Sequence, residues 1–140
     1  MNSLYTAEQV KAFEKSTFVK KGDDLLAMME AANHSVDELI ETYPKSEFLI
    51  LCGPGNNGGD GYFIGVGLSK LNKSVKFLNV LDKSKKSHLC EHAFKKAENL
   101  IFINSNELKN ISIDTVIIDA ILSLIHISEP TRLLSIGYAR

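Results

Sequence analysis

The 140-residue chain has only two cysteines, Cys52 and Cys90, which are too few and too poorly placed to predict a disulfide framework. It also lacks a strong charge of either sign, because 16 basic and 17 acidic residues leave a net charge of −1. This balance gives no electrostatic reason to expect nucleic acid or an anionic membrane as a partner. No apolar run approaches the roughly 20 residues that span a bilayer, and the first residues lack a signal-peptide layout. We therefore expect a cytoplasmic protein.

The hydrophobic pattern predicts strands that alternate with helices. Helices are expected from Thr6, from Asp23 or Asp24 up to Pro44, and over residues 62–71 and 87–100. Strands are expected over residues 48–52, 75–81, 101–103 and 115–118. Such crossover units produce a mostly parallel sheet. The predicted fold class is α/β, a Rossmann-like three-layer sandwich with N-terminal helices.

The most informative segment, residues 53–61, is Gly-Pro-Gly-Asn-Asn-Gly-Gly-Asp-Gly, between a predicted strand and a predicted helix. A glycine-rich turn in that place lets backbone N–H groups approach a phosphate at the helix N-terminus. Gly53, Gly55 and Gly58 match the dinucleotide-binding spacing; the alternative is a tight turn whose glycines merely permit positive φ and close packing. Asn56, Asn57 and Asp60 add polar groups that a bare phosphate loop does not need. Asp60 either binds a ligand or caps the helix.

A second polar group, Asp119, ends the last predicted apolar strand. Ligands of parallel sheets bind outside the carboxyl ends of strands, near a switch in strand order. The glycine segment and Asp119 both lie at such ends, so the pattern directs them to one crevice. A carboxylate there binds a cation or a hydroxyl, or caps a helix, and oxygen ligands suit hard cations such as Mg²⁺, Ca²⁺ and, by the same logic, K⁺.

Three further features have less specific interpretations. His88, Glu91 and His92 match the motif of inverted zinc peptidases, but Lys95 and Lys96 share that helix face and oppose a cation, which favours a solvated face. The basic loop at residues 82–86 either contacts a nucleotide 2′-phosphate or is simply solvated. Cys52 has no nearby histidine in sequence to activate it and is interpreted as a small buried apolar residue.

The glycine-rich segment resembles the signature loop of the NAD(P)H-hydrate epimerase family, also known as the YjeF N-terminal domain. Three other segments resemble the same family, with Asn33 standing where the family usually has glycine. They are residues 5–10 (Tyr-Thr-Ala-Glu-Gln-Val), 28–32 (Met-Met-Glu-Ala-Ala) and 115–121 (Thr-Val-Ile-Ile-Asp-Ala-Ile). The resemblance covers roughly residues 4–121.

This resemblance implies an isomerase that interconverts the R and S epimers of hydrated NADH or NADPH, together called NAD(P)HX, in cofactor repair. It implies substrate binding by Asn56, Asn57, Gly58, Gly59 and Asp60. It implies a potassium ion, K⁺, held by Asn57 and Asp119. It is also compatible with a homodimer and with a dehydratase, fused or separate.

The family's catalytic aspartate lies in an aspartate-isoleucine-proline-serine-glycine segment that this sequence does not contain, nor does it contain the serine that accompanies it in the potassium site. We therefore assign no catalytic residue and expect the chain alone to lack epimerase activity. Residues 122–132 resemble one reading frame of a transposon-based sequencing adapter. We accordingly divide the chain into a partial domain, residues 1–121, incomplete at its C-terminus, and a non-native tail, residues 122–140.

Two alternatives remain open. The same fold occurs in non-catalytic binding scaffolds, including RNA-decapping and lipoprotein-binding proteins. An ordinary dinucleotide-dependent oxidoreductase would need an acidic residue about 20 positions after the glycines, and Asp82 lies later than that.

Overall fold

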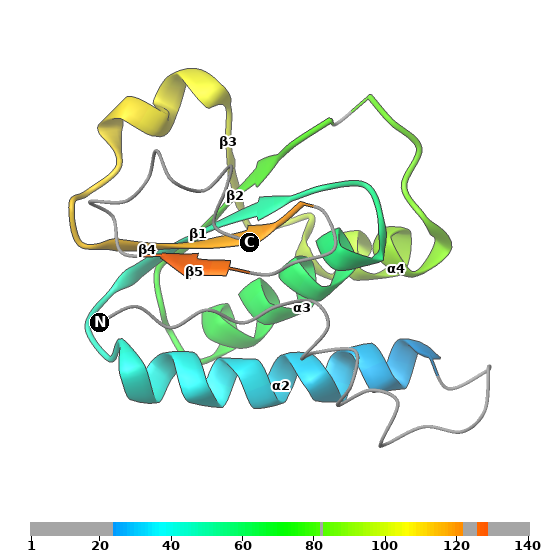
Figure 1. Cartoon of the computed structure of the whole chain (residues 1–140), viewed down its shortest axis with the longest axis horizontal. Helices are drawn as coiled ribbons and strands as arrows, with labels where there is room; N and C mark the ends of the chain where they lie inside the picture. The colour runs from blue at the N-terminus through cyan, green and yellow to red at the C-terminus, as the bar shows by residue number, and fades with distance from the viewer. Residues whose placement is uncertain (1–23, 82, 122–125, 129–140) are drawn as a thin grey trace.

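A computed structural model describes residues 24–81, 83–121 and 126–128. These residues form a five-stranded sheet with three helices packed beneath it (Figure 1). The predicted helix from Thr6, Asp82 and most of the predicted tail lie outside the described residues. No helix in the described part of the chain is long and apolar enough to cross a membrane.

The order of helices and strands agrees with the sequence prediction. The helices are α2 (Asp24–Thr42), α3 (Asn56–Lys70), α4 (His88–Ala97) and the short 3₁₀ helix η2 (Ser105–Asn110), which was not predicted. The strands are β1 (Glu47–Cys52), β2 (Val75–Asn79), β3 (Ile101–Ile103), β4 (Thr115–Ala120) and β5 (His126–Ser128). β2 ends two residues earlier than predicted because the chain turns at Val80 and Leu81, where Leu81 has a positive φ of 61°. β4 runs two residues further than predicted, so Asp119 lies within it.

The sheet order is β3-β2-β1-β4-β5, in which the first four strands are parallel and β5 is antiparallel to β4. The chain therefore extends to one side of β1 with β2 and β3 and to the other side with β4. That reversal makes the carboxyl ends of β1 and β4 the switch point at which ligands of such sheets bind. β5 belongs to the segment predicted to be a non-native tail. Backbone pairing at an open sheet edge requires no particular side chains, so the origin of the tail stays a prediction.

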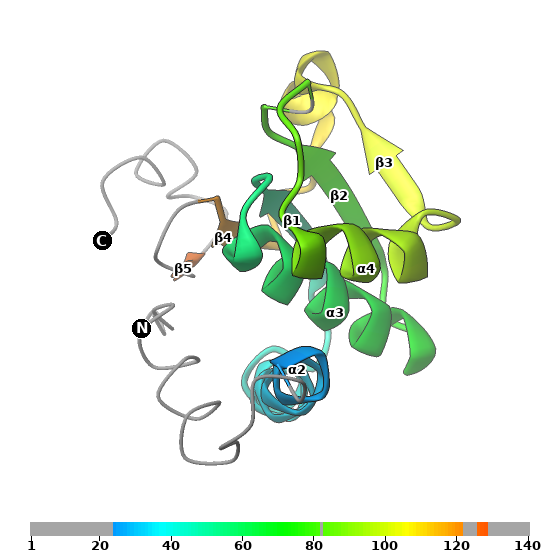
Figure 2. The ribbon, with the colours of Figure 1, turned by 90° about the vertical axis from the view of Figure 1, so that its right-hand side faces the viewer.

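The two faces of the sheet are covered differently. Figure 2 shows α2, α3 and α4 together on one face, where Phe48, Ile50 and Phe77 are buried in the larger core cluster. On the other face a smaller cluster is packed by residues of η2 and its flanks; it comprises Leu49, Leu51 and Ile117, with Leu108 and Ile111 against them. The predicted mostly parallel α/β fold is confirmed. Among the described residues, long helices cover only one face, so the third predicted layer is represented there by η2 alone.

Helix α3 begins at Asn56, six residues earlier than the predicted start at Tyr62. The glycine-rich segment is therefore mostly the first two turns of a helix and not a loop. Gly55 is the N-cap in an extended conformation, with φ −87° and ψ −171°, and no described glycine has a positive φ. Each helical glycine costs about 1 kcal/mol relative to alanine. The helix forms here nevertheless, because residues without β-carbons can pack closely against the strand ends.

Candidate functional site

The ends of β1 and β4 are in backbone contact at the switch point. The Gly53 amide donates to the Ala120 carbonyl at 3.1 Å, directly after the strand pair Cys52–Ala120. A β-carbon on Gly53 would overlap the carbonyl oxygen of Ile121. Only glycine at this position therefore lets the two strand ends approach each other so closely.

The glycines of α3 bring the helix against the same strand ends. A β-carbon on Gly58 would overlap the carbonyl oxygen of Gly53. One on Gly61 would lie 2.7 Å from the Ala120 β-carbon and 2.9 Å from the Cys52 sulfur. No described glycine has a positive φ, so these glycines serve close backbone approach.

The polar residues of the segment differ in exposure. Asn56 is exposed, and its Oδ1 accepts a 2.5 Å hydrogen bond from the Ser87 hydroxyl. Asn57 is half-buried, and its Oδ1 is buried without a hydrogen-bond partner among the described residues. Asp60 is only 2% exposed and lies in the second turn of α3. The predicted capping role of Asp60 is therefore wrong, because the helix starts before it and Gly55 is the cap.

Asp119 lies at the same sheet edge in β4, opposite Leu51 of β1, and is half-buried. Its Oδ1 accepts a 3.2 Å hydrogen bond from the Ile121 amide. Strand alternation puts Asp119 on the face of Ile117, whereas α3 and Asn57 cover the opposite face. A cation shared by Asn57 and Asp119 would therefore have to lie beyond the strand ends.

A part-buried hydrogen bond between Tyr62 and Asn79 was missed from the sequence. The Tyr62 hydroxyl donates to Asn79 Oδ1 at 2.5 Å and connects α3 to the end of β2. Tyr62 is 1% exposed, and burial is the largest cause that raises the pKa of its phenol above the ordinary value. Its ring packs against those of Phe77 and Phe94 at centroid distances of 5.5 and 5.4 Å. The available signal was a polar residue, Asn79, inside the otherwise apolar strand predicted over residues 75–81.

The two thiols lie in the core next to the site. Cys52 is 1% exposed, which confirms its interpretation as a small buried apolar residue. Cys90 is fully buried, and its sulfur donates to the Gly53 carbonyl at 3.6 Å. Burial, more than any neighbouring charge, raises the pKa of Cys52 well above its usual value and that of Cys90 to about 11. Both thiols are therefore protonated at neutral pH and are poor nucleophiles.

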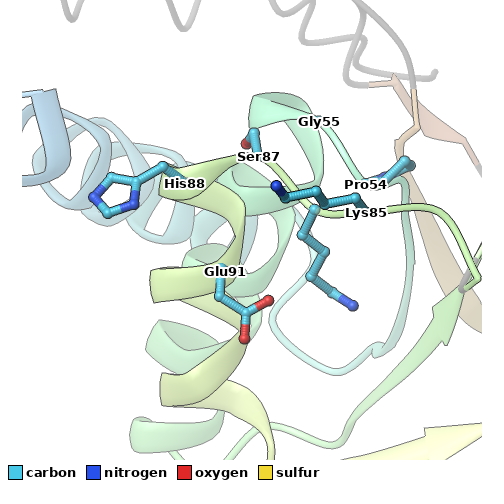
Figure 3. A pocket seen from close by; sticks show the side chains of 7 residues that line it. Pro54, Gly55, Lys85, Ser87, His88 and Glu91 are labelled. Atoms are coloured by element: carbon cyan, nitrogen blue, oxygen red, sulfur yellow. The ribbon is translucent and has the colours of Figure 1, made fainter.

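A pocket of about 840 Å³ opens beside the first turn of α3 (Figure 3). Pro54 and Gly55 line one side, and the lysines of the basic loop, Lys85 and Lys86, line it together with Ser87, His88 and Glu91. The structure thus brings part of the basic loop next to the glycine segment. We call this cavity the Lys85–Lys86 pocket.

The two histidines of α4 lie side by side at a ring-centroid distance of 4.7 Å. Both are exposed, as is Glu91 between them. In the described part of the chain, no group of three histidine, cysteine, aspartate or glutamate residues is placed to hold a metal ion. The exposed positions of these side chains confirm a solvated helix face.

The sheet order and the glycine-rich helix start define a Rossmann-like α/β domain with a mostly parallel sheet. The sequence model described as "YjeF-related protein N-terminus" matches residues 25–134. The chain belongs to this family.

Curated relatives of the chain carry names that agree with the family. An NAD(P)H-hydrate epimerase from Weissella koreensis is 28% identical over 93% of this chain and 59% of its own length. One from Roseobacter litoralis is 42% identical over 46% of this chain and 31% of its own length. A bifunctional NAD(P)H-hydrate repair enzyme from Methanocaldococcus jannaschii is 43% identical over 35% of this chain and 10% of its own length. The chain thus spans less than two thirds of the relatives it matches.

A solved structure shares the fold. The crystal structure of yeast ynu0 (YNL200c) superposes with a TM-score of 0.59 at 19% sequence identity, covering 86% of this chain and 56% of the yeast chain.

Proposed function

We propose that this chain carries the substrate-binding half of an NAD(P)H-hydrate epimerase. The observation that carries the proposal is the placement of residues 56–60, which open α3 at the carboxyl end of β1 against the end of β4. The names of the relatives from Weissella koreensis and Roseobacter litoralis support the choice of reaction. The substrates are the R and S epimers of hydrated NADH and NADPH.

Residues 56–60 bind the substrate in this proposal. The glycines let the start of α3 pack directly against the end of β1, since a β-carbon on Gly58 would overlap the Gly53 carbonyl oxygen. The start of α3 contributes backbone N–H groups and the positive end of the helix dipole, both of which favour a phosphate. Asn56 is already held by Ser87 at 2.5 Å, so its carboxamide is oriented before a ligand arrives.

Potassium belongs to the same proposal, with Asn57 and Asp119 as ligands. The buried Oδ1 of Asn57 has no hydrogen-bond partner among the described residues, and a buried carbonyl oxygen left in that state is stabilised by a cation. A bound monovalent cation supplies a fixed positive charge that orients polar groups of the substrate. Epimerisation also needs a positioned acid or base, and we assign no described residue to that role.

The proposal is tested by the binding of hydrated NADH and hydrated NADPH to the chain. Calorimetry measures this binding in potassium chloride and in choline chloride. Choline is too large to replace potassium. Wild-type protein should bind the hydrates about tenfold more tightly in potassium chloride than in choline chloride, a difference in binding free energy near 1.4 kcal/mol. Asn57→Ala and Asp119→Ala should remove this dependence. Asn33→Ala, on the exposed surface of α2, is the matched control and should keep it.

Other outcomes favour the alternatives. Absence of binding in both salts would favour a non-catalytic scaffold. Tighter binding of undamaged NAD⁺ than of the hydrates, with hydride transfer, would favour an oxidoreductase. The presence of a dehydratase partner and of a homodimer is part of the same proposal, supported by the name of the bifunctional relative for the first.

A further inference from the structure

The Lys85–Lys86 pocket is joined to the proposed substrate segment by two hydrogen bonds. Ser87, which lines the pocket, donates its hydroxyl to Asn56 Oδ1 at 2.5 Å. The Ser87 amide donates to the Pro54 carbonyl at 2.8 Å. A ligand that contacts Asn56 therefore lies next to this pocket.

The position of the pocket in the sheet suggests which part of a nucleotide would reach it. The loop that carries Lys85 and Lys86 follows β2, the strand next to β1. In doubly wound nucleotide-binding sheets, the residues at this strand end contact the adenine ribose. A basic side chain there accommodates a 2′-phosphate.

The charges around the pocket favour an anion. Lys85 is exposed and in Figure 3 lies between the Pro54–Gly55 turn and the first turn of α4. Lys86 is half-buried, and its Nζ lies 4.4 Å from the centre of the Phe94 ring, which positions the ammonium group without neutralising it. Among the described lining residues Glu91 carries the only carboxylate, and two ammonium groups outweigh it.

The N-termini of α3 and α4 add to this positive potential. Gly55 caps α3 and Ser87 caps α4, and both line the pocket. The first N–H groups of each helix have no partner within the helix. The positive end of each helix dipole therefore lies at the pocket wall.

We propose that the Lys85–Lys86 pocket binds the 2′-phosphate of hydrated NADPH, so that the site prefers hydrated NADPH to hydrated NADH. The identity of the ligand rests on the proposed function. The phosphate-binding property of the pocket rests on the two lysines, the two helix starts and the link from Ser87 to Asn56.

Two small probes test the pocket separately from the reaction. Adenosine 2′,5′-bisphosphate carries the additional phosphate, and adenosine 5′-monophosphate lacks it. Binding of both to the full chain is measured by calorimetry at low salt. Wild-type protein should bind the bisphosphate about tenfold more tightly, since a hydrogen bond to a charged group is commonly worth that much.

Charge substitutions of both signs give the decisive comparison. Lys85→Gln and Lys86→Gln should each weaken bisphosphate binding about fivefold to tenfold and leave monophosphate binding unchanged. Glu91→Gln should strengthen bisphosphate binding a few-fold, since it removes a like charge. Lys83→Gln is the control, because Lys83 is an exposed lysine of the same loop that does not line the pocket. It should change neither affinity.

The outcomes separate this inference from the proposed function. Equal affinity of the wild-type protein for the two probes would overturn the proposal that the pocket binds a phosphate. Equal losses of bisphosphate affinity in Lys83→Gln and Lys85→Gln would overturn it as well. Equal, tight binding of hydrated NADH and hydrated NADPH would overturn it too and leave the proposed function in place. Selective bisphosphate binding with no binding of either hydrate would support the phosphate pocket and reject the proposed function.

Discussion

The backbone of Gly58 lies so close to the carbonyl oxygen of Gly53 that a β-carbon on Gly58 would overlap that oxygen. Gly53 itself is held by the Ala120 carbonyl through its amide and by the Cys90 sulfur through its carbonyl. The contact therefore joins the first turn of α3 to the ends of β1 and β4 and to α4. It explains why a helix with poor intrinsic propensity forms here.

Gly58→Ala should cost about 3 kcal/mol or more of unfolding free energy, because the overlapping atom is backbone and cannot rotate away. Urea denaturation measures the change. Gly55→Ala is the matched control. No atom lies within 4 Å of a β-carbon at Gly55, and alanine is only a poorer N-cap than glycine, so the loss should stay below about 1 kcal/mol. Equal losses in the two variants would contradict the close-packing role.

Ser87→Ala should destabilise the protein by about 1–2 kcal/mol, because it removes the bonds to the Cys90 amide at 3.2 Å and to Asn56 at 2.5 Å. Ser87→Thr keeps the hydroxyl and should recover most of the loss. Ser84→Ala, in the exposed loop, should change little. Thermal denaturation of the three variants gives the comparison, and a Ser87→Ala midpoint equal to that of Ser84→Ala would refute the capping role.

The Tyr62–Asn79 hydrogen bond should contribute measurably to stability. Tyr62→Phe leaves the side-chain oxygen of Asn79 without this donor, at an expected cost of about 1–2 kcal/mol in the free energy of unfolding. A double-mutant cycle with Asn79→Ala isolates the pair, and we expect a coupling energy of about 1 kcal/mol. Additive losses would mean that the two side chains act independently.

Stability should decline at alkaline pH through the buried thiols. An unfolded cysteine ionises near pH 8.5, whereas the pKa of Cys90 is about 11 in the folded protein. The folded state then binds more protons, so the contribution of this thiol is complete below about pH 8.5 and is lost as pH rises toward 11. Urea titrations at neutral and alkaline pH measure the free energy of unfolding. We expect it to fall less steeply with pH in Cys90→Ala than in the wild-type protein, by up to about 1.4 kcal/mol per pH unit. Identical slopes in the two proteins would reject this cause.

The alternation of strands and helices was predictable because burial on the sheet imposes a regular apolar pattern. β1 over Glu47–Cys52 and β3 over Ile101–Ile103 appear within one residue of the prediction, and α2 starts at Asp24 as expected. The glycine-rich segment and Asp119 were correctly directed to the same sheet edge, because all parallel strands end there. Topology alone sufficed for that inference.

The start of α3 could not be predicted, because local propensity and tertiary packing point in opposite directions. Glycines at 53, 55, 58, 59 and 61 favour a loop by propensity, yet most of them lie in a helix that packs where a β-carbon would collide. The burial of Asp60, the bond from Ser87 to Asn56 and the pocket between α3 and α4 all depend on that helix start.

The sequence by itself determined the fold class, the family resemblance and the sheet edge at which the polar residues gather, since these follow from periodicity and motif. Only the tertiary structure decided what the glycines do, which face of β4 carries Asp119, and that two lysines of the basic loop line a pocket beside Asn56. Those relationships join residues that are far apart in the sequence; Ser87 and Asn56, for example, are separated by 31 positions. No local pattern encodes such contacts, because they arise when separate elements pack against one another.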